Sequence, residues 1–535
     1  MKLNAQFADH SEEMKAAGIV LPGFDVAAMR EAARKHPRWI HIGPGNIFRV
    51  FVARLADELL ARGEHWPITA VTPLDPRELD EQLGRHDLLT LGVTLNPDGT
   101  TDMRVIAGIG EGLASQREDD YARLLDIARD PEVTQLSFTI TEKGYVIADD
   151  DDALSEQAAA DVDRGPHGPH ATTMALVAGM LHARHAAGGA PINLLSFDNF
   201  SHNGDKLRDS VLRIATEWHG RGAVEEDFIA WLSDTANVAF PISVIDKITP
   251  RPNERIAEKL AKIGFTDMDV HLLGRTPLAG FVNTEPAEYL VIEDQFAAPT
   301  PDWESIGVHV VERDVCDQFE HMKVTTCLNP LHTALAISGC LLGFDTIDEE
   351  MRDDDLAALV HRLGWVESLP VVVDPGIVKP ADFLREVEEV RFPNRYLPDS
   401  PQRIAMDTSQ KLAIRFGETL KAYERDGRDM AELIAIPLVF ALWCRYLLAI
   451  DDAGEPFEPS SDPLYDQLHA GLADVTLGAV TPEDAHRLLD PILSRRSIFG
   501  VDLYDTPLAE KVEQLWVELV SGPGAVRRVI AKEIH

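Results

Sequence analysis

One lysine, one asparagine and one histidine stand close together in a segment that is otherwise mostly apolar. Lys323 is followed by apolar and hydroxyl-bearing residues, then by Asn329 and His332, and a second apolar run covers residues 334–344. Because burial disfavours an ammonium group, a lysine among uncharged neighbours loses its proton more easily than one in water. A general acid or base that works near neutral pH needs such a group. The segment therefore predicts proton-transfer chemistry at Lys323.

The spacing of Lys323 and His332 implies an irregular helix. Each residue of an unbroken helix advances by about 100° around the axis, so these two side chains would point to roughly opposite faces. They can act on one substrate only if the helix breaks or bulges between them. Pro330 could break it, because proline removes a backbone donor, and a π-type bulge would serve as well. The structural alternative is a lysine that reaches solvent from one helix, followed by a second helix with Asn329 as N-cap.

The length of 535 residues is enough for two or three domains. With 45% hydrophobic and 26% charged residues, the composition is that of an ordinary globular protein. No apolar run approaches the roughly 18 residues that span a bilayer, and the first residues lack the apolar core of a signal peptide. The four cysteines show neither paired nor metal-binding spacing. We therefore expect a cytoplasmic protein without a metal site.

Acidic residues outnumber basic ones by 89 to 50, which gives a formal net charge of −39. Nucleic acids and anionic membranes bind basic patches, so neither is expected as a partner. Acidic runs such as residues 149–152 lack the central glycine of a calcium-binding loop. We interpret the charge as a source of solubility or an adaptation to salt.

A strand, a glycine turn and the start of a helix follow one another near the N-terminus. A short β-type run ends at Gly43, and an amphipathic helix is expected from about residue 46 to residue 62. Glycines at such a turn let the backbone approach a pyrophosphate, and the start of the helix supplies free N–H groups. Phe48 replaces the third glycine of the usual fingerprint, so a purely structural turn is the alternative. The predicted cofactor-binding residues of this turn are Gly43, Gly45, Asn46, Ile47, Phe48 and Arg49.

A second expected strand, residues 68–72, completes a β-α-β unit. Asp75 lies just beyond this strand and could bind the adenosine ribose of NAD. It is further from the glycines than the ~20 residues expected, and an aspartate that forms a turn before Pro76 is the alternative. We expect NAD as the cofactor, and NADP is not excluded.

Two later strands carry polar groups at their ends. Residues 135–145 predict a strand that runs into a turn, and residues 194–197 predict a buried strand that is followed by Asn199. Open α/β sheets bind their ligands at the carboxyl ends of parallel strands, so Asn199 could donate an amide hydrogen bond to a substrate oxygen. The pair Asn203-Gly204 is typical of a tight turn. The alternative is an asparagine-rich loop that caps the next helix.

From about residue 300 onward, long helical periodicities dominate the sequence. They cover residues 334–344, 350–364, 402–425, 429–451 and 507–521. The first half is therefore expected to be α/β and the second half mainly helical. No internal repeat or low-complexity linker separates the halves, so we expect them to pack tightly.

Three charged residues of the helical half recur at every fourth position. They are Arg403, Asp407 and Lys411. One interpretation is an exposed helix face with i,i+4 ion pairs. The functional alternative is that the two cations reach a polyhydroxylated or carboxylated substrate.

Seven motifs in a fixed order point to one protein family. They are His41-x-Gly43-x-Gly45-Asn46-x-x-Arg49, Thr139-x-Thr141-Glu142-Lys143-Gly144-Tyr145, Asp198-Asn199 with Asn203-Gly204, Val244-Ile245-Asp246-Lys247-Ile248-Thr249-Pro250, Thr284-Glu285-Pro286 with Glu293-Asp294, Lys323 with Asn329 and His332, and Arg403 to Lys411. With them, the sequence resembles the polyol-specific long-chain dehydrogenases, the mannitol dehydrogenase family, over nearly its whole length. The resemblance implies an N-terminal Rossmann-type NAD(P)-binding domain, residues 1–290, and a mainly α-helical substrate and catalytic domain, residues 291–535. It also implies a zinc-independent hydride transfer at the interdomain cleft.

The resemblance also implies a role for each matching residue. Lys323 corresponds to the general acid/base, Asn199 and Asn329 to the pair that stabilises the oxyanion, and His332 to the partner of a substrate oxygen. Glu320 matches a position that helps to pass protons to solvent, and Asp246, Arg403 and Lys411 match substrate-binding positions. Most members have one residue fewer between the lysine and the asparagine, and small residues where this chain has Pro330-Leu331.

The lysine motif, together with the glycine turn, is most similar to the hexuronate-pathway branch of the family. This branch holds the D-mannonate oxidoreductases, also called fructuronate reductases, so the expected substrate is a sugar acid. Neutral polyols such as mannitol, arabinitol or sorbitol are the alternative, and a nucleotide-binding protein without catalysis is a more distant one. Family members are often monomeric, so a monomer or a weak homo-oligomer is expected.

Overall fold

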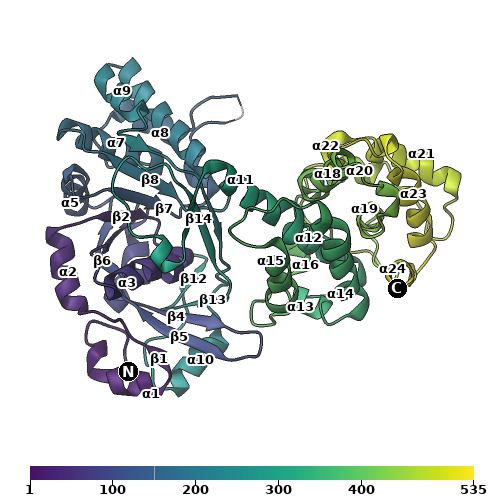
Figure 1. The fold of residues 1–535 in the computed structure, drawn as a ribbon, viewed down its shortest axis with the longest axis horizontal. Helices are drawn as coiled ribbons and strands as arrows, with labels where there is room; N and C mark the ends of the chain where they lie inside the picture. Colours follow the sequence, from purple (N-terminus) through teal and green to yellow (C-terminus); the bar gives the residue numbers. More distant parts are fainter. Residues whose placement is uncertain (150) are drawn as a thin grey trace. The chain divides into compact units, whose positions relative to one another are not determined.

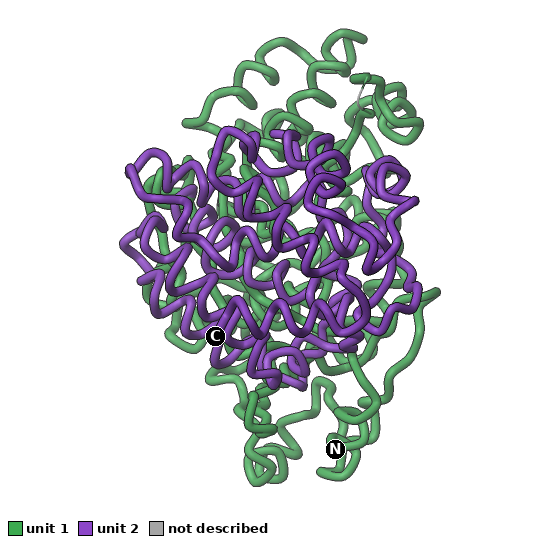
Figure 2. The backbone as a smooth tube through the Cα atoms, turned by 90° about the vertical axis from the view of Figure 1, so that its right-hand side faces the viewer, with its two compact units in different colours: residues 1–316 green, residues 317–535 purple. Residues whose placement is uncertain are grey.

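The computed structural model describes residues 1–149 and 151–535, which form two compact units, residues 1–316 and 317–535 (Figure 2). All the β-strands of the described residues lie in the first unit, and the second unit is built from helices. The predicted fold class, an α/β half followed by a mainly helical half, is therefore confirmed.

The predicted division after residue 290 stays a prediction, because compactness alone does not show where cofactor binding ends and substrate binding begins. In the described part of the chain, no helix combines the length and the apolar character that crossing a membrane requires.

Six parallel strands form the central sheet of the first unit. They are β2 (Trp39–Ile42), β3 (Ile68–Thr72), β6 (Ile109–Ala114), β7 (Gln135–Phe138), β8 (Ile192–Ser196) and β9 (Val238–Ala239). Their order across the sheet is β6-β3-β2-β7-β8-β9, and every neighbouring pair is parallel. Along the chain this is the order 3-2-1-4-5-6 of doubly wound sheets that bind dinucleotides. The winding reverses between β2 and β7, and ligands of this fold bind beyond the carboxyl ends of the strands there.

Both faces of the central sheet are buried, because side chains along each strand alternate between two cores. Ile40 and Ile42 of β2 belong to one core, which they share with helices α5, α7 and α8 (Figure 1). Trp39 belongs to the other core, together with α3 and parts of the smaller sheets. Buried parallel strands need apolar side chains on both faces, which explains their short apolar runs in the sequence. The helices of this unit are α1 (Ser11–Ala16), α2 (Val26–Lys35), α3 (Ala53–Ala61), α4 (Pro76–Glu78), α5 (Glu118–Arg129), α6 (Glu156–Arg164), α7 (Thr173–Ala186), α8 (Asn203–Gly220), α9 (Glu226–Ser233) and α10 (Glu254–Lys262).

Three smaller sheets complete the first unit. The largest has the order β1-β5-β4-β13, the next has the order β10-β14-β15, and β11 pairs with β12 as a hairpin. Their strands are β1 (Ile19–Val20), β4 (Thr90–Leu95), β5 (Thr101–Ile106), β10 (Ser243–Asp246), β11 (His271–Leu273), β12 (Thr276–Leu278), β13 (Phe281–Thr284), β14 (Tyr289–Glu293) and β15 (His309–Val311). The predicted substrate residue Asp246 is thus the last residue of β10, where it pairs with Tyr289 of β14.

The second unit is organised around helix α19 (Ala435–Tyr446), in which every residue is buried. A helix that is apolar on all sides is stable only inside a protein, and α19 packs against α12, α23 and α24. Helix α11 (Arg313–Met322) leads into this unit. The other helices are α12 (Asn329–Leu342), α13 (Ile347–Glu350), α14 (Asp354–His361), α15 (Pro380–Glu386), α16 (Pro401–Ile404), α17 (Thr408–Leu412), α18 (Glu418–Arg425), α20 (Tyr465–Ala470), α21 (Pro482–Leu493), α22 (Arg496–Phe499), α23 (Leu508–Leu519) and α24 (Ala525–Ile534).

The helix predicted for residues 402–425 is wrong as a single element. Helix α16 ends at Ile404, and Asp407 adopts a left-handed conformation with φ 53° before α17 begins. A π-helical turn, Ala413–Gly417, then separates α17 from α18. The break has a tertiary cause, because the Asp407 N–H donates to the carbonyl of Ser461 at 2.8 Å instead of to its own helix.

Candidate active site

The glycine turn after β2 is shaped by its contact with the end of β7. Gly43 has φ 94°, and a Cβ atom at this position would lie 2.3 Å from the carbonyl oxygen of Thr139. Only glycine therefore fits where the two strand ends approach each other. At Gly45 the situation is the opposite, because an added Cβ atom would meet nothing within 4 Å. The missing side chain leaves open space there, as a bound pyrophosphate requires.

The helix that begins at this turn presents its first N–H groups at the same place. Its first hydrogen bond along the chain runs from the Arg49 N–H to the carbonyl of Gly45, at 3.0 Å. The N–H groups that precede it have no partner within a helix and carry the positive end of the helix dipole. Asn46 and Ile47 are partly exposed at this end. The turn thus fits a phosphate-bearing cofactor through its backbone.

The side chains of Phe48 and Arg49 point into the protein. Phe48 stacks on His41 with ring centroids 4.2 Å apart, and burial lowers the pKa of His41 to about 3. Arg49 donates to the hydroxyl of Thr90 and to the carbonyl of Ala279, at 3.2 and 2.9 Å. Both side chains therefore brace the turn from inside the protein, and the Arg49 N–H is used by the carbonyl of Gly45. A role of Phe48 and Arg49 in cofactor binding stays a prediction.

Asp75 follows β3 as the N-cap of helix α4. Its carboxylate accepts hydrogen bonds from the Arg77 N–H at 2.9 Å and from the Arg77 guanidinium at 2.6 Å. The hydrogen bond from the Arg77 side chain lowers the pKa of Asp75. The structural alternative, an aspartate that forms a turn before Pro76, is confirmed. The ribose contact of Asp75 stays a prediction.

Asp198 joins two of the sequence motifs at the carboxyl ends of β7 and β8. Its carboxylate accepts hydrogen bonds from the N–H groups of Ile140 and Thr141, both at 2.9 Å, and from the Tyr145 hydroxyl at 2.7 Å. These bonds fix the loop after β7 and hold the start of the loop that carries Asn199. Asn199 itself is exposed. Sequence reasoning assigned no role to Asp198, although its place beside Asn199 in the motif was a signal.

Asn203-Gly204 does not form the predicted tight turn. It begins helix α8, which follows directly on the loop that holds Asn199; the N-cap is His202, and no side chain of the loop caps the helix. The Asn203 amide donates to the carbonyls of Asp198 and Ser243 at 2.9 and 3.0 Å, and its oxygen accepts from the Ser243 N–H at 3.0 Å. A Cβ atom at Gly204 would lie 2.5 Å from a backbone carbonyl oxygen. Buried tertiary contacts therefore override the local turn preference, and they tie the Asn199 loop to the strand that ends at Asp246.

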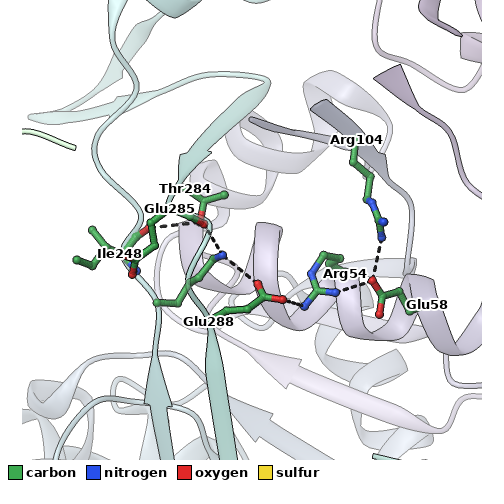
Figure 3. Close-up of polar contacts among 8 residues, drawn as sticks. Arg54, Glu58, Arg104, Ile248, Thr284, Glu285 and Glu288 are labelled. Carbon is green, nitrogen blue, oxygen red and sulfur yellow. Dashed lines mark hydrogen bonds and ion pairs between the residues drawn. The ribbon is translucent and has the colours of Figure 1, made fainter. Parts of the chain in front are cut away.

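A charged network connects the sequence motif that holds Lys247 with the motif that holds Glu285 (Figure 3). Lys247, next to Asp246, donates to the backbone carbonyl of Glu285 at 2.7 Å and to the carboxylate of Glu288 at 2.9 Å. Glu288 also accepts from Arg54, at 2.5 Å. The network borders a cavity of ≈ 350 Å³ in the first unit. Cations and carboxylates neutralise one another there, so the network holds the strand end that carries Asp246.

In the second unit, Lys323 lies at a break between two helices. Helix α11 ends at Met322, a π-helical turn covers Lys323–Cys327, and α12 begins at Asn329. The Leu328 N–H donates to the Lys323 carbonyl at 3.1 Å, five residues back. The predicted break is therefore confirmed, and both a π turn and a new helix contribute to it.

The helix break also determines how exposed Lys323 is and whether Asn329 caps the next helix. Lys323 is 3% exposed, so the alternative of a lysine that reaches solvent is wrong. Leu328, not Asn329, is the N-cap of α12, and Pro330 lies in the first turn. The side chain of Asn329 is partly exposed and is not used as a helix cap. Glu320 lies one helical turn before Lys323, on α11, and is partly buried.

His332 is a mostly buried imidazole next to one carboxylate. Its Nε2 lies 3.8 Å from the Asp399 carboxylate, and its ring packs on Phe392 at 5.0 Å. Burial lowers the pKa of His332 to about 4, against the opposing charge of Asp399. The imidazole is therefore neutral near pH 7, and it can offer a hydrogen bond but no charge to a substrate oxygen.

The predicted cations at residues 403 and 411 both have partners in the protein. Arg403 holds Asp399 with its Nε, at 2.6 Å, and with its Nη2. Lys411 donates to the carbonyls of Met406 and Ile404. The interpretation as an exposed face with i,i+4 pairs through Asp407 is wrong, because the left-handed Asp407 interrupts the helix.

The chain matches two family models. The mannitol dehydrogenase Rossmann domain matches residues 37–305, and the mannitol dehydrogenase C-terminal domain matches residues 315–520. The D-mannonate oxidoreductase of Thermotoga maritima is 45% identical over 540 aligned residues, which cover 100% of this chain and 99% of that protein. The mannitol 2-dehydrogenase of Cereibacter sphaeroides is 29% identical, over 83% of this chain and 86% of that protein.

Two solved structures are similar over the whole chain. The mannitol 2-dehydrogenase of Pseudomonas fluorescens, in a ternary complex with NAD and D-mannitol, has a TM-score of 0.69 and 26% identity over 99% of both chains. A substrate-free D-sorbitol dehydrogenase has a TM-score of 0.80 and 24% identity, and the match covers 99% of this chain and 100% of that chain. The latter shows a shared fold. The predicted Rossmann-type dinucleotide-binding domain is confirmed. Because the two family models together cover most of its length, the chain belongs to the mannitol dehydrogenase family of NAD(P)-dependent oxidoreductases.

Proposed function

We propose that this enzyme interconverts D-mannonate and D-fructuronate with NAD as the cofactor. The observation that carries the proposal is the 45% identity with a D-mannonate oxidoreductase along the full length of both chains. The relative named for mannitol is 29% identical, so the sugar-acid enzyme is the nearer of the two. We further propose that residues 1–290 bind the cofactor and contribute Asn199 and Asp246 to substrate binding, and that residues 291–535 supply the proton-transferring group and the other substrate contacts.

The reaction moves a hydride and a proton. When bound, the nicotinamide supplies the hydride to the carbonyl carbon of the substrate, or accepts it in the reverse direction. Negative charge develops on the carbonyl oxygen during reduction, and we assign Asn199 and Asn329 as the amide donors to that oxygen. Removing one such donor typically costs ~3 kcal/mol, about a hundredfold or more in rate. The Asn329 side chain is available for this role because Leu328 is the N-cap of α12.

Lys323 is the proposed general acid/base. Its ammonium delivers the proton to the oxygen in reduction, and its neutral amine removes that proton in oxidation. The support from the structure is the burial of its side chain, which is 3% exposed at a helix break. His332 is proposed to hydrogen-bond a substrate oxygen, and Glu320, one turn before Lys323, to pass the proton to solvent.

The remaining proposed contacts concern the substrate hydroxyls and the cofactor. Asp246, Arg403 and Lys411 are proposed to bind the hydroxyl groups. The glycine turn receives the pyrophosphate at Gly45, where an added Cβ atom would meet nothing within 4 Å. Asp75 is proposed to bind the ribose, as the acidic residue after the second strand does in sheets of this type that bind NAD.

A substrate panel tests the proposal. The purified protein is assayed for reduction of D-fructuronate and D-fructose, and for oxidation of D-mannonate and D-mannitol, each with the NAD and the NADP couple. We expect the highest kcat/KM for the sugar-acid pair with NAD. A higher kcat/KM for the neutral pair would instead support a polyol dehydrogenase, which the family relatives favour as the second candidate. Binding of NADH without turnover of any substrate would indicate a protein that has lost catalysis.

A further inference from the structure

Arg415 carries a partly buried guanidinium that has few partners among the described residues. Its one hydrogen bond runs from Nη1 to the hydroxyl of Thr333, at 2.5 Å, and no carboxylate of the described residues pairs with it. Burial alone lowers the pKa of Arg415 to about 10. Buried charges in proteins are normally paired and hydrogen-bonded, because desolvation of an unpaired charge is costly. The unpaired state of Arg415 therefore asks for an explanation.

Two fully buried arginines of this chain show what a structural guanidinium looks like. Arg184 donates five hydrogen bonds to backbone carbonyls, at 2.6 to 3.0 Å. Arg445 donates three such bonds. These two side chains use most of their donors to brace loops. Arg415 has one bond, and its Nε and Nη2 have no acceptor among the described residues.

The unused edge of Arg415 is the edge that binds a carboxylate. Nε and Nη2 form one side of the planar guanidinium, and a carboxylate accepts from both in parallel. Arg403 uses this same pair of atoms to hold Asp399. Arg415 thus offers a second carboxylate-binding edge of the same kind, and no carboxylate of the described residues fills it.

The position of Arg415 links it to the proposed catalytic residues of the second unit. Its partner Thr333 directly follows His332 at the start of α12. The charges of Arg415, Arg403 and Arg391 all lower the pKa of His332, and Asp399 is the carboxylate that opposes them. Because Asp399 is held by Arg403, the charge of Arg415 beside His332 is not balanced by this carboxylate. In a chain of net charge −39, such a local excess is what an anionic substrate needs, because screening limits long-range repulsion to about 8 Å.

We propose that Arg415 binds the carboxylate group of the sugar acid through its Nε and Nη2, and that it selects acid substrates over neutral polyols. The inference rests on the proposed function and deepens it. It changes the assignment of the carboxylate partner, because Arg403 is occupied by Asp399 and Lys411 by backbone carbonyls. Arg415 lies outside the seven motifs that pointed to the family, so its role concerns the choice of substrate and leaves the shared hydride transfer unchanged.

The rival explanation is that Arg415 only braces the turn 413–417 against α12 through Thr333. The two explanations differ in their effect on different substrates. A brace supports every substrate equally, whereas a carboxylate partner affects only acids. The ratio of kcat/KM for D-mannonate to kcat/KM for D-mannitol therefore separates them.

The test uses the full-length protein and three variants. For Arg415→Ala we expect KM for D-mannonate to rise about 100-fold, as for other buried charge pairs that lose one partner, while KM for D-mannitol changes less than about threefold. Arg415→Lys keeps the charge without the fork and should lose about tenfold on D-mannonate. Thr333→Val removes the brace and should leave the ratio unchanged. Arg425→Ala, a matched exposed arginine on α18, is the control.

An unchanged ratio, whether from equal losses on both substrates or from no loss on either, would overturn the proposal. Thermal unfolding of each variant shows whether it is folded, and Arg415→Lys provides the answer if Arg415→Ala is not. Calorimetric titration of D-mannonate into the NADH-bound protein gives a second readout that needs no turnover. Wild-type protein that binds D-mannonate tightly through Arg415 but does not oxidise it would refute the proposed function and support the carboxylate site. Binding of D-mannonate that Arg415→Ala does not weaken would refute the carboxylate site alone.

Discussion

Replacing Gly45 with alanine separates the role of the glycine turn in cofactor binding from its role in folding. An added Cβ atom at Gly45 meets nothing within 4 Å, and φ at this residue is not in the left-handed region. The substitution therefore creates no clash inside the protein. An alanine at such a site stabilises a protein by about 0.4–1 kcal/mol, because it restricts the unfolded chain. Gly45→Ala should thus be as stable as the wild type or slightly more stable.

The same methyl group lies where the pyrophosphate is proposed to approach the backbone. A methyl group forced into a packed contact costs about 1–3 kcal/mol, which corresponds to an increase of about 5- to 150-fold in the dissociation constant of NADH. Gly43→Ala should behave differently, because its Cβ atom would lie 2.3 Å from the Thr139 carbonyl oxygen in a backbone with positive φ. That variant should lose stability as well as cofactor affinity.

The assay combines thermal unfolding without cofactor and fluorescence titration with NADH. Gly220→Ala is the matched control, since its added Cβ atom also meets nothing within 4 Å and lies far along the chain from the turn. It should gain a similar small amount of stability, about 0.4–1 kcal/mol, and leave the affinity for NADH unchanged. Wild-type affinity for NADH in a folded Gly45→Ala variant would refute the placement of the pyrophosphate at Gly45.

Two further predictions concern buried carboxyl groups. Burial, with a smaller contribution from Asp353, raises the pKa of Glu350 to about 10, so this group is protonated in the folded protein and ionised in the unfolded chain at pH 7. Stability should fall as pH rises from about 4.3 toward 10, by up to about 1.4 kcal/mol per pH unit, and denaturant unfolding of Glu350→Gln should show a flatter pH dependence. Asp198→Asn should lose about 2–3 kcal/mol of stability in thermal unfolding, because an amide cannot accept all the hydrogen bonds that Asp198 receives from two N–H groups and Tyr145. The control Asp163→Asn, at an exposed position, should change stability by less than about 0.5 kcal/mol. An unchanged pH dependence in Glu350→Gln, or equal losses in the two aspartate variants, would contradict these assignments.

The first strands and the helix break could be predicted because they depend on side-chain patterns within short segments. The strand that ends at Gly43 and the strand 68–72 are short apolar runs next to glycine or polar turns, and both form where expected. The break between Lys323 and His332 followed from geometry alone, since an unbroken helix would separate the two side chains. Its form, a π turn followed by a new helix with Leu328 as N-cap, has no local signature in the sequence.

Other features depend on contacts between distant segments, and the sequence alone could not reveal them. Asn203-Gly204 has the composition of a tight turn, but buried hydrogen bonds to Ser243 make it the start of a helix. The spacing of residues 403–411 suggested one helix, and a contact of Asp407 with Ser461 breaks it. In the same way, the sequence does not show which arginine has a carboxylate partner. Only the structure distinguishes the paired Arg403 from the unpaired Arg415.

The central claim is that an amine buried at a helix break exchanges a proton with a substrate oxygen. Replacing Lys323 with methionine keeps a long side chain at this buried position and removes the amine. The most direct measurement is the single-turnover rate of D-fructuronate reduction by NADH-saturated Lys323→Met. The account predicts unchanged NADH affinity and a rate lower by about 10²- to 10⁴-fold. A rate close to that of the wild type, in a folded variant that binds NADH, would contradict it.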